Sequence, residues 1–443
     1  MARRRHRLAR LLAPRPLPRP RPVVHAAPRW RRHPRGPADV PAADPGPSRA
    51  RRGRERKRPG GEPVSTIFIT GATGYLGAYT AVRLLAADPE LRLAALIRAR
   101  DDAEAHDKLW RALQLHLDAD GFRAALPRFD VVRGDLHAPR LGVAPKTRER
   151  LVAEVDSVLH IAASLNRKSS KACFNANLRG TLSVINLARD VADDHGLRRY
   201  SHVSTVAVAG QRDREVVTED AAVDWDRSDY DPYGRTKKFA EHMAHELLPD
   251  VRKTLFRPSI VMGDSRFPET TQFDMVRAFC VLADLPVLPF RPDGRLDIVN
   301  ADWVGDAIAT IHAKADPAHS IYHLSAGTGS LTTEAIAHAM TASTGRRARF
   351  VPRLLKPFKA AVDLAGGSHA KNPVTLVGSL LKVFLPYITY DTVFDNSRAV
   401  AEVGRAPTPF TEYCGPLYRW AKEVRYRYPY APLPPLSRGE EAA

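Results

Sequence analysis

Short apolar runs alternate with longer stretches of helical periodicity from residue 66 onward. Short apolar runs bounded by Gly, Asp or Pro are typical of buried strands, and apolar residues spaced three and four apart are typical of the helices that cover them. We expect strands at 66–70, 91–97, 129–132, 156–161, 200–204 and 255–262. We expect helices near 78–87, 102–126, 168–193 and 231–248. This alternation predicts an α/β fold, a doubly wound parallel sheet with helices on both faces.

The regular alternation ends near residue 262, and prolines become frequent after it. We therefore expect a nucleotide-binding domain at 64–265, completed by about 296–325. A smaller C-terminal substrate-binding region is expected at 266–295 and 326–430, followed by a flexible end at 431–443. The longest apolar run, 374–390, contains Lys382 and Pro386 and is shorter than the roughly 20 residues that a bilayer requires.

The first 63 residues hold much of the positive charge. The chain of 443 residues has a formal net charge of +19, and 19 of its 68 Lys+Arg stand in this segment with four acids. Such an Arg- and Pro-rich composition cannot build a core, so we expect disorder. We favour a misplaced translation start or an inert tail. A nucleic-acid or membrane arm, a transit peptide and a twin-arginine signal are the alternatives, although no apolar region follows the arginines.

Cysteine and histidine usage narrows the class of protein. Three cysteines, Cys173, Cys280 and Cys414, are too few for a disulfide scaffold. They stand in no zinc-binding spacing, and no metal is expected. The composition of the body is that of a cytoplasmic protein for which we expect no specific nucleic-acid partner.

A glycine-rich turn, TGATGYLG at 70–77, directly follows the first expected strand and opens a helix. Glycines at this spacing allow a tight turn, a close backbone approach to a pyrophosphate, and packing of the helix on the strand. The helix N-terminus would then face the phosphate charge. The residues expected to hold a dinucleotide here are Gly71, Thr73, Gly74, Tyr75, Leu76 and Gly77.

The ends of the next two strands bear on the choice of cofactor. An acid after the second strand would bind the ribose hydroxyls of NAD, but Arg98 and Arg100 stand there instead. Arginine suits a 2′-phosphate, so NADPH is favoured over NADH. Asp135 and Leu136, after the third strand, are expected near the adenine.

Tyr233 and Lys237 stand four residues apart and share one face of a helix. A nearby ammonium lowers the pKa of a tyrosine and makes it usable in acid–base catalysis. Ser204 and Thr205 end the fifth strand, at the sheet edge where ligands bind. A hydroxyl at that edge can polarise a substrate carbonyl beside Tyr233.

Together these segments resemble an extended short-chain dehydrogenase/reductase with a Rossmann-type domain, over about 64–430. The motifs are TGATGYLG, GDL at 134–136, HIAAS at 160–164, NLRGT at 177–181, VST at 203–205, YGRTK at 233–237, RPSIVMGDS at 257–265 and LDIVNADWVGDAI at 296–308. HIAASLN and RPSIVMGDS are similar to the thioester-reductase and fatty-acyl-CoA-reductase branch, also called male-sterility-like.

The resemblance implies roles for single residues. Thr205 would be the active-site hydroxyl, Tyr233 the acid/base and Lys237 its partner. Asn177 would support the helix near the active site. The residues implied to lie at the cofactor, the last three beside the nicotinamide, are Ala162, Ala163, Arg257, Pro258 and Ser259.

The function implied is NADPH-dependent reduction of an acyl thioester to an aldehyde or alcohol. Because the sequence shows no carrier domain, acyl-CoA or an acyl-carrier protein would deliver the substrate in trans. A basic, apolar stretch at 353–364 suits an acyl channel, a peripheral membrane contact or a plain core helix, and Pro357 is expected to interrupt a long helix there. Two features depart from the family: Ala209 stands where Tyr is frequent, and 350–430 matches no motif.

Three other functions remain open. A nucleotide-sugar epimerase or dehydratase would keep NAD bound, which Arg98 disfavours. A hydroxysteroid-type dehydrogenase would oxidise a bulky alcohol. A dinucleotide-sensing protein with a nucleic-acid-binding tail would not need the Thr205, Tyr233 and Lys237 set.

Overall fold

The computed structural model describes residues 65–342, 345, 347–367, 373–389 and 391–435. These residues belong to one unit, Val64–Ala443. The expected tail at 1–63 and most of the expected flexible end lie outside the described residues. The proposed division of the body into nucleotide and substrate regions stays a prediction.

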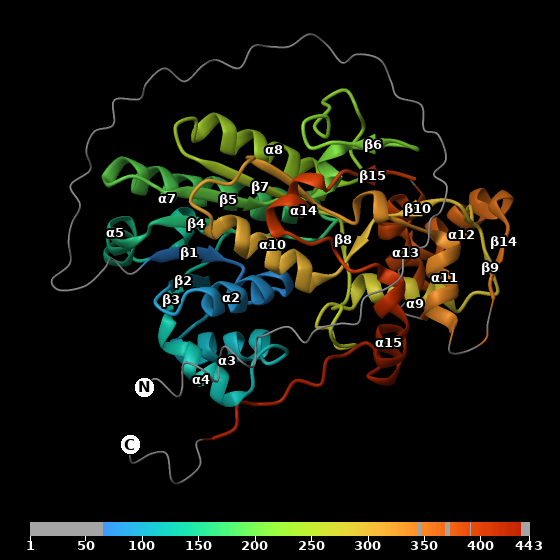
Figure 1. Ribbon diagram of the computed structural model, residues 1–443, viewed down its shortest axis with the longest axis horizontal. Helices are drawn as coiled ribbons and strands as arrows, with labels where there is room; N and C mark the ends of the chain where they lie inside the picture. Colours follow the sequence, from blue (N-terminus) through green and yellow to red (C-terminus); the bar gives the residue numbers. More distant parts are fainter. Residues whose placement is uncertain (1–64, 343–344, 346, 368–372, 390, 436–443) are drawn as a thin grey trace. The chain divides into compact units, whose positions relative to one another are not determined.

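A seven-stranded parallel sheet forms the centre of the molecule, in the order β12-β7-β5-β4-β1-β2-β3 (Figure 1). Its strands are β1 (Thr66–Thr70), β2 (Arg92–Ile97), β3 (Phe129–Arg133), β4 (Ser157–His160), β5 (Arg199–Val203), β7 (Lys253–Pro258) and β12 (Ile321–Leu324). The chain moves outward from β1 in one direction and from β4 in the other. The reversal leaves a crevice at the carboxyl ends of the strands, where ligands of such sheets bind. The predicted α/β fold class is thereby confirmed.

Helices cover both faces of this sheet (Figure 1). On one face lie α2 (Tyr75–Ala87) and α10 (Ala301–Ala313), and on the other lie α7 (Thr181–Asp194) and α8 (Pro232–Leu247). Residues from β1, β4, α7 and α8 share one apolar cluster that includes Phe68, Val158, Val184 and Ala244. Burial of this cluster fixes the helices against the strands.

Two expected helices are divided in the structure. The expected helix at 102–126 is two helices, α3 (Asp102–Leu113) and α4 (Ala119–Ala125), because the Asp118 carboxylate accepts the N–H of Gly121 and starts a new helix. The one at 168–193 consists of α6 (Ser170–Cys173), a π-helical segment (Phe174–Gly180) and α7. π-Helical segments are rare in proteins overall, but those that occur are often found at functional sites.

The strand prediction differs from the structure in the second half of the chain. The expected strand at 255–262 ends as β7 at Pro258, and β8 (Ile260–Val261) pairs instead with β11 (Ile298–Val299). The seventh strand, β12, was not among the strands expected from the sequence. The remaining short strand pairs are β6 (Val216–Val217) with β15 (Val393–Phe394), β9 (Val287–Leu288) with β14 (Arg349–Phe350), and β10 (Arg295–Leu296) with β13 (Leu331–Thr332).

The C-terminal half adds a mainly helical region with its own apolar cluster, which includes Phe279, Met340, Phe384 and Phe410. Its helices are α9 (Asp274–Ala283), α11 (Thr333–Thr341), α12 (Leu355–Gly367), α13 (Pro373–Thr389) and α15 (Phe410–Glu423). Of the two other helices, α5 (Pro145–Glu154) contacts α7, and α14 (Ser397–Val403) contacts α10 and β12.

Proline does not divide the helices of this region as the sequence analysis expected. Pro357 is the third residue of α12, where a backbone N–H would have no helical acceptor, and the helix continues through it. α13 likewise runs through Lys382 and Pro386. Across the described ranges, no helix combines the length and the hydropathy that crossing a bilayer requires.

Candidate active site

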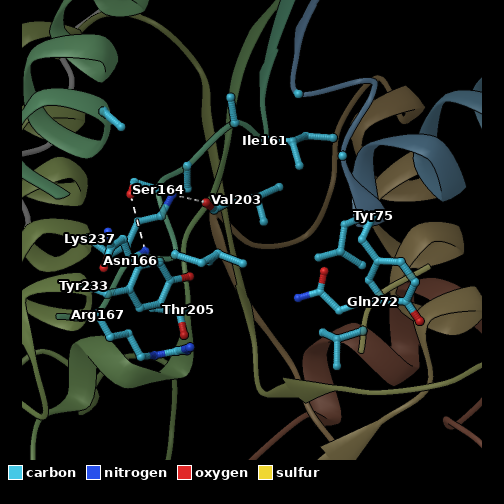
Figure 2. A pocket seen from close by; sticks show the side chains of 18 of the residues that line it. Tyr75, Ile161, Ser164, Asn166, Arg167, Val203, Thr205, Tyr233, Lys237 and Gln272 are labelled. Atoms are coloured by element: carbon cyan, nitrogen blue, oxygen red, sulfur yellow. Dashed lines mark hydrogen bonds between the residues drawn. The ribbon is translucent and has the colours of Figure 1, made fainter. Parts of the chain in front are cut away.

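One cavity of about 1000 Å³ lies at the carboxyl ends of the central strands (Figure 2). Figure 2 shows Tyr75 and Gln272 on one side of the cavity, and Tyr233, Thr205 and Arg167 on the other. Most of the residues expected from the sequence line this cavity: Gly71, Thr73, Gly74, Tyr75, Leu76, Gly77, Arg98, Asp135, Leu136, Ala162, Ala163, Ser204, Thr205, Tyr233, Lys237, Pro258 and Ser259. The structure does not place Arg100, Asn177 or Arg257 among the lining residues.

The turn between β1 and α2 leaves no room for a side chain at Gly71 or at Gly77. Gly71 has a φ of +80°, and a Cβ there would lie 2.7 Å from the backbone N of Ala162. A Cβ at Gly77 would lie 1.8 Å from the Gly71 carbonyl oxygen. The backbone N–H groups at the N-terminus of α2 are therefore accessible from the cavity. Such an arrangement fits the pyrophosphate of a dinucleotide.

The end of the cavity near β2 and β3 carries both signs of charge. Arg98 is exposed and lines the cavity. Burial disfavours the charge of Asp135, but hydrogen bonds from the backbone N–H and ring of His137, both 2.9 Å, outweigh it and lower the pKa of Asp135. Arg100 points elsewhere: its side chain is 85% exposed and its Nε lies 2.9 Å from Glu104 Oε2.

Tyr233 projects from the first turn of α8 into the cavity. The Asp231 carboxylate caps this helix by accepting the N–H of Gly234 at 2.9 Å. Burial raises the pKa of Tyr233 above its usual value, while the charge of Arg167 and a hydrogen bond with Thr205 lower it. Thr205 follows β5 and is held by its own backbone contacts, because its Oγ1 accepts the N–H of Ala207 at 3.2 Å and donates to the carbonyl of Pro258 at 3.4 Å.

Lys237 lies one turn after Tyr233 and is almost fully buried. Its Nζ donates to the carbonyl of Val203 at 2.7 Å. Burial lowers the pKa of Lys237 to about 7, and the charge of Glu241 only partly offsets this effect. Near neutral pH, part of the Lys237 population is therefore uncharged.

Asn177 lies behind the cavity wall, in the π-helical segment. Its Oδ1 accepts the N–H of Ser164 at 2.7 Å, and its Nδ2 donates to the carbonyl of Ser164 at 3.2 Å and to Thr236 Oγ1 at 3.1 Å. It therefore joins the loop after β4 to the helix that carries Tyr233.

Arg257 is held away from the cavity although it directly precedes two lining residues. Its guanidinium makes two hydrogen bonds to the Glu241 carboxylate, at 2.9 and 2.7 Å, and one to the Glu219 carbonyl at 2.7 Å. Only 2% of the side chain is exposed. Residues alternate sides along a strand, so Pro258 faces the cavity edge when Arg257 faces α8.

The sequence analysis missed part of the lining. Arg167 and Lys168 come from the loop after β4, and α13 contributes a face made of Leu380, Val383, Phe384 and Tyr387. The spacing of these four α13 residues is that of one helix face, a signal readable in the sequence. Nothing in the sequence shows that this face meets the cavity, since residues in contact there, such as Tyr387 and Asp231, stand 156 positions apart.

The chain matches the sequence profile of a family described as "Male sterility protein" over residues 69–308, more than half its length. It is 27% identical over 289 residues to the carboxylic acid reductase of Mycobacterium marinum, covering 59% of this chain and 24% of that protein. It is 27% identical over 283 residues to the isonitrile lipopeptide synthase of Mycobacterium tuberculosis, covering 58% and 11%. The chain thus spans a quarter or less of these relatives.

Solved structures share the fold. The terminal R domain of the myxalamid PKS-NRPS pathway superposes with a TM-score of 0.70 at 23% identity, over 83% of this chain and 93% of that one. The reductase (R) domain of a non-ribosomal peptide synthetase from Mycobacterium tuberculosis gives a TM-score of 0.63 at 21% identity, over 83% and 94%.

Proposed function

The chain belongs to the male sterility protein family, and we propose that it is an NAD(P)H-dependent reductase that reduces an acyl thioester with NADPH. The observation that carries this proposal is that a single cavity holds the phosphate turn, the Thr205, Tyr233 and Lys237 set, and the apolar face of α13. The phosphate turn suits a dinucleotide, the Thr205, Tyr233 and Lys237 set suits a reactive carbonyl, and the apolar face of α13 suits an acyl chain.

The cofactor would lie along the glycine turn, with Arg98 at its 2′-phosphate and Lys237 at the nicotinamide end. Bound there, NADPH would supply the hydride that the carbonyl carbon receives. Arg98 supports NADPH over NADH because a guanidinium matches the geometry and charge of a phosphate.

Thr205 and Tyr233 would act on the carbonyl oxygen. Their hydroxyls polarise the carbonyl and stabilise the negative charge that develops as its carbon is reduced. Tyr233 then gives its proton to that oxygen, and the resulting hemithioacetal collapses to an aldehyde and a free thiol. A second reduction of the aldehyde at the same residues would give an alcohol.

The substrate would enter with a thiol carrier, either CoA or an acyl-carrier protein. The relatives named above include a lipopeptide synthase and a carboxylic acid reductase, and these names support an acyl substrate for this chain. Leu380, Val383 and Phe384 offer the acyl chain an apolar wall.

The test is NADPH consumption by the full chain with dodecanoyl-CoA, dodecanal and a UDP-sugar offered separately. We expect consumption with dodecanoyl-CoA, and a loss of about 10²- to 10⁴-fold in kcat for Tyr233→Phe, because the general acid is removed. Tyr430→Phe is the matched control, since it removes a hydroxyl from an exposed tyrosine outside the cavity.

Two results would contradict the proposal. Consumption with dodecanal alone would identify a simple carbonyl reductase. No consumption with any substrate, together with NAD co-purifying in the protein, would indicate a nucleotide-sugar epimerase.

A further inference from the structure

The Arg167 side chain is 19% exposed and lies among three aromatic rings at the reactive end of the cavity. Its guanidinium carbon lies 4.9 Å from the ring centroid of Tyr233, 4.9 Å from that of Tyr387 and 5.4 Å from that of Phe384. Figure 2 shows this side chain on the same side of the cavity as Tyr233 and Thr205. A guanidinium within about 6 Å of an aromatic ring is attracted to its π-system, and more strongly when water is excluded.

The place of this guanidinium is fixed from two helices. Arg167 Nε lies 3.2 Å from Asp231 Oδ2, which also accepts the hydroxyl of Tyr387 at 2.7 Å. The other oxygen of Asp231 caps α8 at Gly234. The carboxylate that starts the helix of Tyr233 thus also holds the arginine and α13.

We propose that Arg167 is a positioning residue for Tyr233. The Arg167 guanidinium holds the phenol ring of Tyr233 and stabilises the phenolate left after proton transfer. This inference rests on the proposed function, because it requires Tyr233 to be the proton donor. The phenol is neutral before the reaction and negative after it. A fixed cation beside the ring therefore stabilises the product of proton transfer more than the reactant, which is the condition for a gain in rate.

Lys237 alone does not supply a lasting positive charge. Burial lowers its pKa to about 7, whereas an arginine keeps its charge throughout the working range of an enzyme. Burial disfavours the charge of Arg167 too, but Tyr387, Tyr233 and Asp231 outweigh it and raise its pKa.

The titratable groups around Tyr233 come from three elements. They are Arg167 and Cys173 from the segment between β4 and α7, Asp231 and Lys237 from α8, and Tyr387 from α13. Arg167 and Lys237 are the basic groups in this set, and Arg167 is the one whose charge does not fade above neutral pH.

The surroundings of Arg167 disfavour a role as a binding site for an anionic substrate group. Its charge is already compensated by Asp231, and rings cover it on several sides. A second anion would have to displace these contacts. Lys168, the next residue, instead donates a hydrogen bond to Ser379 of α13.

The experiment measures kcat against pH for dodecanoyl-CoA reduction by the full chain, in the wild type, Arg167→Met, Arg167→Lys and Lys168→Met. Because the pKa of Lys237 is about 7, a fall in activity near neutrality reports that group, and the limb on which activity falls at higher pH reports deprotonation of Tyr233. Loss of the cation raises the pKa of the phenol. In Arg167→Met we therefore expect this limb about one pH unit higher and kcat near neutrality about tenfold lower.

The two other variants separate charge from structure. Arg167→Lys keeps a cation and should hold the limb near its wild-type position. Lys168→Met removes a neighbouring cavity cation that also contacts α13, and its limb should not move. If Arg167→Met does not fold, Arg167→Gln carries the same expectation, since it keeps a planar polar group without the charge.

The inference is overturned if the high-pH limb of Arg167→Met or Arg167→Gln lies at its wild-type position. It is also overturned if Arg167→Lys shifts that limb as far as the uncharged variants do. Failure of the proposed function looks different. In that case Tyr233→Phe keeps its activity or dodecanoyl-CoA is never reduced, whatever residue stands at 167.

Discussion

At the scale of single residues, Arg98 is the side chain that we propose binds the 2′-phosphate of NADPH. Removal of a charged hydrogen bond costs about 1.5–3 kcal/mol, or about 10- to 150-fold in affinity. For Arg98→Ala we expect KM for NADPH to rise by that factor while KM for NADH changes little. Steady-state kinetics with both cofactors would show it.

Arg100→Ala is the matched control for this prediction. Arg100 is two residues further along, pairs with Glu104 and does not line the cavity, so its loss should leave the cofactor preference unchanged. Equal effects of both variants, or an equal rise in KM for NADH, would mean that Arg98 does not read the phosphate.

At the scale of elements, Asn177 joins the loop after β4 to α8. Asn177→Ala would leave the backbone of Ser164 and the hydroxyl of Thr236 without this partner, at a cost of about 1–3 kcal/mol. We expect a fall in kcat of roughly tenfold or more with a fold intact by circular dichroism, because Tyr233 stands on the helix that loses its support.

Asn177→Asp refines the same prediction. Aspartate can still accept the N–H of Ser164, but it cannot donate to the Ser164 carbonyl or to Thr236 and it buries a carboxylate, so its kcat should be no higher than that of Asn177→Ala. A kcat for Asn177→Ala equal to that of the wild type would show that the link between loop and helix does not position the tyrosine.

At the scale of the whole molecule, the buried ion pair of Arg257 and Glu241 joins β7 to α8, and Arg257 also holds the carbonyl of Glu219. Removal of one partner leaves an unpaired buried charge. We expect Glu241→Ala to lower the free energy of unfolding by about 3–5 kcal/mol, measured by urea denaturation.

Replacement of both partners tests the origin of that loss. The double variant Glu241→Leu with Arg257→Leu should recover most of the stability, since neither charge of this pair stays buried without its partner. Glu104→Ala breaks exposed ion pairs with Arg100 and Lys108 and should cost far less stability than Glu241→Ala. Equal losses in Glu241→Ala and Glu104→Ala would contradict the argument from burial.

The sequence by itself determined the α/β class, six of the seven central strands and the glycine turn, because these depend on short-range signals. Apolar period, turn glycines and helix caps act over a few residues and can be read from a single chain. The same signals were weak for β12 and for the divided helices, where one aspartate or a π-helical segment changed the path of the backbone.

Only the tertiary structure decided which side chains meet. Arg257 lies next to lining residues in the sequence, yet the strand turns it toward Glu241. Arg167 stands in no motif, yet Asp231 of α8 and the rings of Tyr233, Phe384 and Tyr387 converge on it. Contacts between segments so far apart along the chain arise from packing of the apolar faces, and local patterns do not encode which faces will touch.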